Sequence, residues 1–308
     1  MLIGIDGGGT KTKVMLTDMQ LRPLAEKVSG PSSIRTVPFE TAIANILEAT
    51  TACLAAVPGA EITAAFAGLG DVAGEEDGFL VAAALRNHPA FSQSLVEVKN
   101  DVHNAHAGAL EGKAGIAIII GTGSVAFGVD ERGKSHRAGG YSYKEGDFGS
   151  AFGLGKQALS MLGKAWDHRV EPSPLTEDLV RHFGIKTFMD MVRLYDALHT
   201  ERTEVAKLAP FVTRHAAEGD PNARAIIEFA TDELLEMIRG VDRSLSLHNR
   251  EIGVIGSLGN AETPLRSEFI RKIRSYDPTF AVFPARRDPV FGSCVLAKQL
   301  TQRYGNLM

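Results

Sequence analysis

The sequence contains only two cysteines, Cys53 and Cys294, which lie far apart and outside any spacing typical of metal sites. No apolar run approaches the roughly 18 residues that a membrane span needs. A strand-like run already begins at Leu2, where the charged and apolar regions of a signal peptide would lie. These absences predict a protein of the reducing cytoplasm.

Basic residues are also not in excess, because 33 Lys and Arg stand against 37 Asp and Glu and give a net charge of −4. The sequence has no basic stripe, so we expect no nucleic acid as a partner. Because it also has no long apolar run, we expect no membrane as a partner. At 308 residues, the chain is long enough for two domains with substantial cores.

The most informative segment that is present is the N-terminal MLIGIDGGGTKTK. An apolar run ends at Asp6, and glycines and hydroxyl residues then form a turn whose main-chain N–H groups can hold an anion. A carboxylate at the end of a strand can hold a hydrated Mg²⁺. The spacing differs from that of a P-loop, and it favours the other large phosphate-handling architecture, the actin-like ATPase fold of sugar kinases. An ordinary glycine-rich hairpin is the alternative.

A second copy of this plan occupies residues 115–132, where an apolar run leads into Gly121-Thr122-Gly123-Ser124 and a further apolar run. A matching pair follows in each half, at residues 65–71 and 254–260. Strand–loop units that recur in the same order suggest duplicated domains. Two such domains would face their glycine-rich turns across one cleft, where both could bind a polyphosphate.

Alternating periodicities predict an α/β architecture in the first half of the chain. The predicted strands are 2–6, 13–17, 62–67 and 95–99, and the predicted helices are 38–56, 77–87 and 103–110. We expect an N-terminal domain over 1–111 and a C-terminal domain over 112–308 with a helical insertion at about 150–250. A final helix over 289–302 could pack back onto the first domain.

Two acidic residues are candidates for chemistry. Asp101 follows a strand, where a carboxylate can accept the proton of a substrate hydroxyl during phosphoryl transfer. Asp147 lies in a long polar loop and could bind two sugar hydroxyls, while Tyr141 or Tyr143 could lie against a pyranose face. Helix capping by Asp101, and by Asp147 or Ser150, is the structural alternative.

Other polar groups are weaker candidates. His103 and His106 are three residues apart on a short helix, but no further ligands stand at zinc-finger spacing. Arg286 and Arg287 precede the final helix and could contact a nucleotide, although a surface turn explains them as well.

These motifs occur in the order of one family. The chain resembles the BadF/BadG/BcrA/BcrD ATPases, and within them the N-acetylglucosamine and glucosamine kinases. The similarity spans nearly the whole chain and is carried by Asp6–Thr10, Asn100-Asp101, Gly121–Ser124, Gly139-Gly140 with Gly146–Ser150, and Gly256-Ser257.

The resemblance implies a two-domain actin-like ATPase fold and transfer of the ATP γ-phosphoryl group to the 6-hydroxyl of an amino sugar. Asp101 would be the catalytic base, and Asp6 would lie near Mg²⁺. Homodimers are common in this group. The implied binding residues are Gly8, Gly9, Thr10, Lys11 and Thr12 in a first phosphate loop, Gly121, Thr122, Gly123 and Ser124 in a second, Gly256 and Ser257 at the adenosine, and Gly140, Tyr141 and Asp147 at the sugar.

The chain departs from the pattern of kinases specific for N-acetylglucosamine, because Val125, Tyr141 and Phe148 replace asparagine, tryptophan and glutamate. The early loop 30–35 also lacks the asparagine expected to contact the sugar. Because valine cannot bond an acetamido group, we expect a preference for glucosamine, whose ammonium would pair with Asp147 or Asp71. Two other functions remain open. One is an ATPase that activates 2-hydroxyacyl-CoA dehydratases through a cysteine-bound iron–sulfur cluster, and the other is a non-catalytic nucleotide-binding regulator.

Overall fold

The computed structural model describes residues 1–144 and 146–305. It divides the chain into two compact units, Met1–Ala114 with Ala285–Met308, and Gly115–Pro284. The boundary expected at 111/112 therefore falls after Ala114. The second unit ends at Pro284 rather than at 308, because the last helix packs on the first unit.

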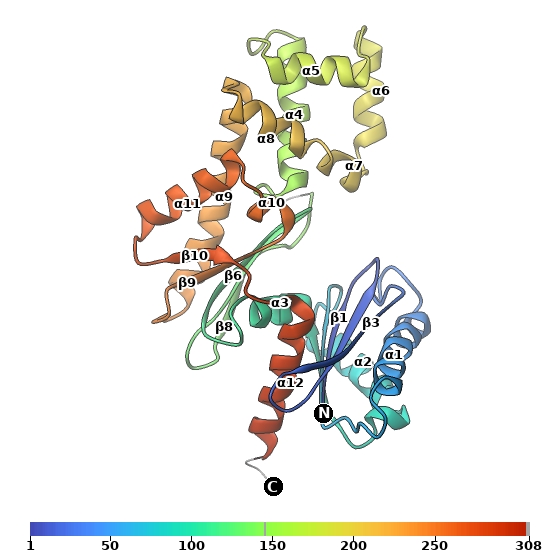
Figure 1. Ribbon diagram of the computed structural model, residues 1–308. Helices are drawn as coiled ribbons and strands as arrows, with labels where there is room; N and C mark the ends of the chain where they lie inside the picture. The colour runs from blue at the N-terminus through green and yellow to red at the C-terminus, as the bar shows by residue number, and fades with distance from the viewer. Residues whose placement is uncertain (145, 306–308) are drawn as a thin grey trace. The chain divides into compact units, whose positions relative to one another are not determined.

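The first unit is built around a five-stranded sheet in the order β3-β2-β1-β4-β5 (Figure 1). The strands β1 and β2 form an antiparallel hairpin, while β1, β4 and β5 run parallel. Their bounds are β1 Leu2–Gly7, β2 Thr12–Thr17, β3 Pro23–Ser29, β4 Ala64–Leu69 and β5 Leu95–Asn100. The helices are α1 Phe39–Ala55, α2 Glu75–Arg86, α3 Asp101–Ala109 and α12 Pro289–Gly305, with a 3-10 turn, η1, over Pro89–Phe91.

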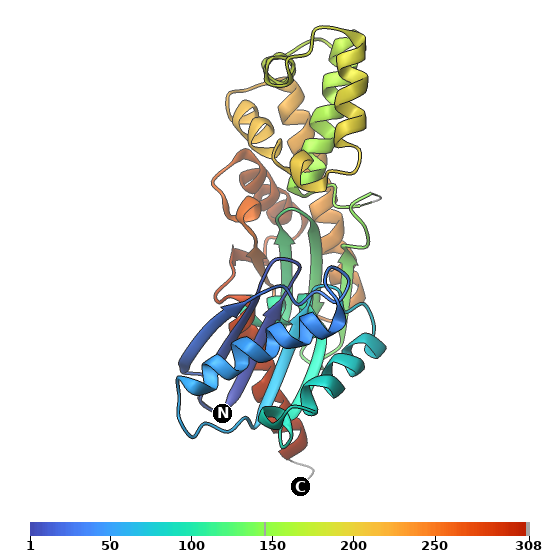
Figure 2. The same ribbon diagram turned by 90° about the vertical axis from the view of Figure 1, so that its right-hand side faces the viewer.

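Successive side chains of β1 point to opposite faces of the sheet, because a strand has a period of two residues. Ile3 and Ile5 pack with buried residues of α1 and α2 on one face of the sheet. Figure 2 shows the blue helix α1 in front of the sheet. Leu2 packs with Ala297 and Leu300 of α12 on the opposite face.

The helices α3 and α12 approach each other closely, and both lie against the strands of the first sheet. A Cβ atom at Gly292 would lie 2.0 Å from the main-chain oxygen of Asn104, and one at Gly108 would lie 2.4 Å from that of Asp288. Only glycine allows this spacing of the two backbones. The contact fixes the start of α12 beside the ends of β1 and β4.

The second unit repeats the strand plan, with a sheet in the order β10-β9-β6-β7-β8. The strands β6 and β7 form the antiparallel hairpin, and β9 and β10 run parallel to β6. The predicted duplication of the sheet is therefore confirmed. The strand bounds are β6 Gly115–Ile120, β7 Ser124–Val129, β8 Ser135–Gly139, β9 Glu251–Ile255 and β10 Ala281–Pro284.

A helical insertion separates β8 from β9, as expected. It consists of α4 Ala151–Trp166, α5 Pro174–Phe183, α6 Phe188–Leu198, α7 Arg202–Ala206, α8 Ala209–Ala217 and α9 Pro221–Ser244. The short α10 Ser257–Asn260 and α11 Pro264–Tyr276 connect β9 to β10. Asp220 caps α9 by accepting a hydrogen bond from the Ala223 amide, and Pro221 opens the helix. Within the described residues, no helix is both long and apolar enough to cross a membrane.

Candidate active site

The first glycine-rich turn joins β1 to β2 and is held by its own backbone. The Gly8 amide donates to the Lys11 carbonyl, and the Gly8 carbonyl accepts from the amides of Ser32 and Ser33. Gly9, Thr10 and Lys11 are exposed and free of sheet pairing. Thr12 differs from the expectation for it, because it is buried at the start of β2 and its hydroxyl donates to the Gly30 carbonyl at 2.7 Å. The exposed tip, rather than Thr12, therefore presents groups to a ligand.

Asp6 stands at the carboxyl end of β1 and accepts a hydrogen bond from Nδ2 of Asn104 at 2.9 Å. Burial raises the pKa of Asp6 above its ordinary value, while the Asn104 amide opposes that shift and the nearby Asp288 adds to it. Asn104 is fully buried, and its Nδ2 also donates to the Pro289 carbonyl. Asn104 thus ties Asp6 to the start of α12.

The donor set at Asp6 fits a hydrated Mg²⁺ rather than a protein-caged metal. No group of three or more His, Cys, Asp or Glu able to hold a metal occurs in the part of the chain that the structure describes. Mg²⁺ in phosphoryl-transfer sites is commonly bound by one or two carboxylates, with water and substrate phosphates completing its shell. A desolvated carboxylate such as Asp6 gains from a nearby cation.

Asp101 is the first residue of α3, and its side chain lies at the same sheet edge as Asp6. A Cβ atom built on Gly70, just after β4, would lie 3.2 Å from Oδ2 of Asp101. The helix cap is Asn100, whose side chain accepts from the Val102 amide, so capping by Asp101 is not the arrangement found. The strand ends of β1, β4 and β5 thus bring Asp6, Gly70 and Asp101 to one edge.

The second glycine-rich turn joins β6 to β7 and is attached to the start of α4. The amides of Ala151 and Phe152 donate to the carbonyls of Gly121 and Thr122. The Gly121 amide donates to the Gly123 carbonyl at 3.0 Å, which closes the turn. Thr122 is exposed at its tip.

Asp147 is buried behind this second turn and is already bonded on both oxygens. Its Oδ1 accepts from the Ser124 amide at 3.0 Å, and its Oδ2 forms an ion pair with Arg202 of α7 at 2.8 Å. A Cβ atom at Gly123 would lie 2.4 Å from an Arg202 nitrogen and 2.9 Å from Oδ2 of Asp147. The sequence motifs did not indicate Arg202, which lies in the helical insertion.

Residues Gly139 to Tyr143 follow β8 in the second unit and are partly buried, except for Tyr141. Gly140 has a positive φ of 69°, and its carbonyl accepts from Arg137 at 2.5 Å. Tyr141 is 85% exposed, whereas the ring of Tyr143 packs edge-on against Phe152. Tyr141 therefore has the freedom to lie against a ligand. Position 145, between Lys144 and Gly146, lies outside the described residues.

Gly256 follows β9 and lies beside the second turn. Its φ is 99°, and a Cβ atom there would lie 2.5 Å from the Ile120 carbonyl oxygen and 3.2 Å from the Gly121 amide nitrogen. Ser257 is exposed at the start of α10. The structure thus brings Gly256 and Gly121 together at the ends of two neighbouring parallel strands, which is where open α/β sheets bind ligands.

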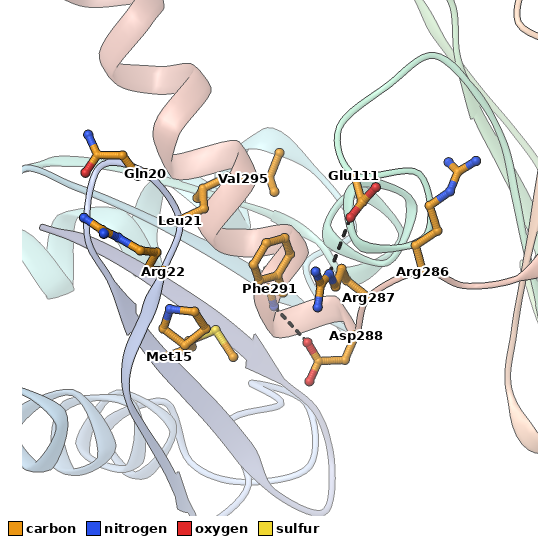
Figure 3. Close-up of a pocket in the computed structure, with 11 residues that line it drawn as sticks. Met15, Gln20, Leu21, Arg22, Glu111, Arg286, Arg287, Asp288, Phe291 and Val295 are labelled. Atoms are coloured by element: carbon orange, nitrogen blue, oxygen red, sulfur yellow. Dashed lines mark hydrogen bonds and ion pairs between the residues drawn. The ribbon is translucent and has the colours of Figure 1, made fainter.

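A cavity of about 700 Å³ lies elsewhere in the first unit, between the β2–β3 hairpin and the start of α12 (Figure 3). Arg286 and Arg287 line it rather than the glycine-rich turns. Arg287 pairs with Glu111 at 3.4 Å and lies over the Phe291 ring, while its amide donates to the Gly108 carbonyl. These contacts fit the alternative interpretation of a structured surface turn.

Comparison with known proteins extends the similarity over nearly the whole chain. The BadF/BadG/BcrA/BcrD ATPase family matches residues 3–278. The chain belongs to this family. The resemblance inferred from the motifs is therefore confirmed.

Two relatives are similar to the chain over much of its length. An N-acetylmuramic acid/N-acetylglucosamine kinase of Clostridium acetobutylicum is 27% identical over 301 residues, which cover 96% of this chain and 98% of that protein. A glucosamine kinase of Vibrio cholerae is 26% identical over 230 residues, covering 73% of this chain and 75% of that protein. Relatives of this chain therefore include proteins named as kinases of acetylated and of free amino sugars.

The fold is shared with solved sugar-kinase structures. A proposed N-acetylglucosamine kinase of Chromobacterium violaceum superposes with a TM-score of 0.73 at 28% identity, over 97% of this chain and 98% of that one. A ROK hexokinase of Thermus thermophilus shares the fold at 17% identity, with a TM-score of 0.59 and coverage of 98% and 99%. The expected two-domain actin-like ATPase fold is confirmed.

Proposed function

We propose that the protein is an ATP-dependent amino-sugar kinase that transfers the γ-phosphoryl group to the 6-hydroxyl of glucosamine or N-acetylglucosamine. The observation that carries this proposal is the match to sugar kinases over almost the full length of the chain. One such alignment covers 96% of this chain and therefore includes both of its units. The site geometry is compatible with that chemistry.

The candidate base, phosphate turns, nucleotide residues and Asp6 each have a role in one displacement. The sugar 6-oxygen attacks the γ-phosphorus, its proton passes to the Asp101 carboxylate, and ADP leaves with the electrons of the broken P–O bond. The exposed tips of the two turns, Gly9–Lys11 and Thr122, bind the phosphates through main-chain N–H groups. Gly256 and Ser257 border the adenosine. Asp6 would hold Mg²⁺, which supplies charge neutralisation on the phosphates when bound.

The alternative of an iron–sulfur ATPase activator is disfavoured by the two cysteines. Both thiols are buried, and burial raises the pKa of Cys53 to about 11 and that of Cys294 to about 12. A cluster ligand must be a thiolate, which such surroundings oppose. Cys294 instead sits against β1 and lies near the Met15 carbonyl. A non-catalytic regulator is the remaining alternative, and Asp101 at the sheet edge favours catalysis over it.

The test is an ADP-release assay with MgATP and a panel of sugars that includes both amino sugars, glucose and mannose. Turnover of an amino sugar well above the ATP-only rate supports the proposal, and mass spectrometry of the product locates the phosphate. Asp101→Asn serves as the matched control for contaminating kinases. ATP binding without turnover of any sugar would instead favour the regulator. Light scattering of the same sample tests the homodimer.

A further inference from the structure

Arg202 reaches from α7 of the helical insertion to the second glycine-rich turn. One terminal nitrogen pairs with Asp147 and lies against Gly123, and the guanidinium carbon stands 5.4 Å from the centre of the Tyr143 ring. A guanidinium held by a carboxylate and by an aromatic ring has a well-defined orientation. The guanidinium of Arg202 is therefore held in place beside Asp147.

The same contacts remove Asp147 as a partner for a cation. Asp147 is 8% exposed, its Oδ1 accepts from the Ser124 amide and its Oδ2 accepts from Arg202. A charge-assisted pair of this kind already neutralises the carboxylate. A substrate ammonium placed here would meet the positive charge of Arg202 as well as the negative charge of Asp147.

By contrast, Arg202 and Ser124 have hydrogen-bond donors without a partner among the described residues. A guanidinium has five N–H groups, and the Arg202 side chain is 40% exposed. Within the part of the chain that the structure describes, the buried Nε of Arg202 and the buried hydroxyl of Ser124 have no hydrogen-bond partner. Buried polar groups normally find partners, so the cluster has unmet capacity for an oxygen acceptor.

We propose that Arg202 is a specificity-determining residue, which favours amino sugars whose nitrogen carries an acyl group and disfavours those with a free ammonium. This inference rests on the proposed function. The acyl carbonyl accepts a hydrogen bond from the guanidinium, whereas the ammonium is repelled by it. Specificity then arises from one attraction and one repulsion. It reverses the preference for glucosamine that Val125 suggested, because Asp147, one of the two predicted carboxylate partners, is taken by Arg202.

The experiment measures kcat/KM for N-acetylglucosamine and glucosamine with wild type, Arg202→Gln and Arg202→Lys. Arg202→Gln should lower the value for N-acetylglucosamine about tenfold, the effect of losing one strong hydrogen bond. It should also raise the value for glucosamine, because the Asp147 carboxylate is released to bind the ammonium. Arg202→Lys keeps the charge and should preserve the wild-type order of the two sugars. Arg193→Gln, an exposed arginine of the same insertion, is the matched control and should change neither value.

A purely structural role for Arg202 would lower both values together, and that result overturns the inference. So does weaker binding of a nonhydrolysable ATP analogue to Arg202→Gln in titration calorimetry without sugar, because it would assign the guanidinium to a phosphate. If wild type phosphorylates neither amino sugar, the proposed function fails and this inference fails with it. If wild type turns over N-acetylglucosamine and the variants lose both sugars equally, only this inference fails.

Discussion

Replacement of Asn104 by alanine should lower the free energy of unfolding by more than the removal of a side chain of this size would by itself. The side chain is fully buried, bonds the Asp6 carboxylate at 2.9 Å and bonds the Pro289 carbonyl at 3.3 Å. A hydrogen bond to a charged group contributes about 1.5–3 kcal/mol, and a neutral one contributes about 0.5–1.5 kcal/mol. The two losses sum to roughly 2–4.5 kcal/mol in the free energy of unfolding.

The assay is urea unfolding of wild type, Asn104→Ala, Asp6→Ala and the double variant. If the carboxylate–amide bond is the main contribution, the two substitutions share one interaction, and their effects should fall short of additivity by about 1.5–3 kcal/mol. Asn222→Ala provides a matched control, because the partly buried Asn222 side chain at the start of α9 donates to a main-chain oxygen, that of Glu171. Its effect should stay within about 0.5 kcal/mol.

Strict additivity of the Asp6 and Asn104 effects would refute this reasoning. So would a loss for Asn104→Ala no larger than that of the Asn222 control. Either result would mean that the amide is a filler of space beside Gly68, where a Cβ atom would lie 1.9 Å from Oδ1 of Asn104.

Three further outcomes are expected. Asp101→Asn should reduce kcat on the best sugar by roughly 10²–10⁴ while leaving ATP affinity nearly unchanged, and steady-state kinetics with near-normal kcat would reject Asp101 as the base. Gly292→Ala should lower the free energy of unfolding by about 1–3 kcal/mol through the clash with α3, whereas Gly74→Ala, where nothing lies within 4 Å, should change it little in the same urea titration. The third outcome concerns pH. Hydrogen bonds from Thr279 and Arg250 lower the pKa of Asp277 from 3.8 to about 2. The ionised carboxylate therefore stabilises the fold fully above pH 3.8, and this contribution is lost as the pH falls toward about 2. Asp277→Asn should flatten the fall of Tm over that interval, and an unchanged slope would contradict this account.

Local sequence was sufficient for the features that repeat. The two glycine-rich turns and their flanking strands were predictable because strand periodicity and glycine punctuation are local signals, and the topology confirms their equivalence. The strand β3, Pro23–Ser29, was missed because most of its residues are exposed, so it lacks the alternation of a half-buried strand.

The supporting residues of the candidate site could not be found in the same way. Asn104 meets Asp6 across 98 positions of sequence, and Arg202 meets Asp147 across 55. One signal did exist for Asn104, because it lies three residues after Asp101 and so falls on a neighbouring part of the same helix face. Arg202 lies in an insertion without motifs, and only the tertiary structure places its guanidinium beside Gly123.

The two units carry different chemistry at the ends of their parallel strands, among which β1 and β6 hold equivalent places in the two sheets. In the first unit, β1 and β5 lead into carboxylates, Asp6 and Asp101, which can hold a cation or accept a proton. In the second unit, β6 and β9 lead into Gly121 and Gly256, whose close approach excludes side chains and leaves main-chain groups to face a ligand. The two units share the same sheet topology. The residue type at each strand end then decides whether that end can accept a proton or leave room for a phosphate. Exchanging the types should therefore abolish function with the sheet intact: Gly256→Asp would add both a Cβ clash and a negative charge where the nucleotide is proposed to bind.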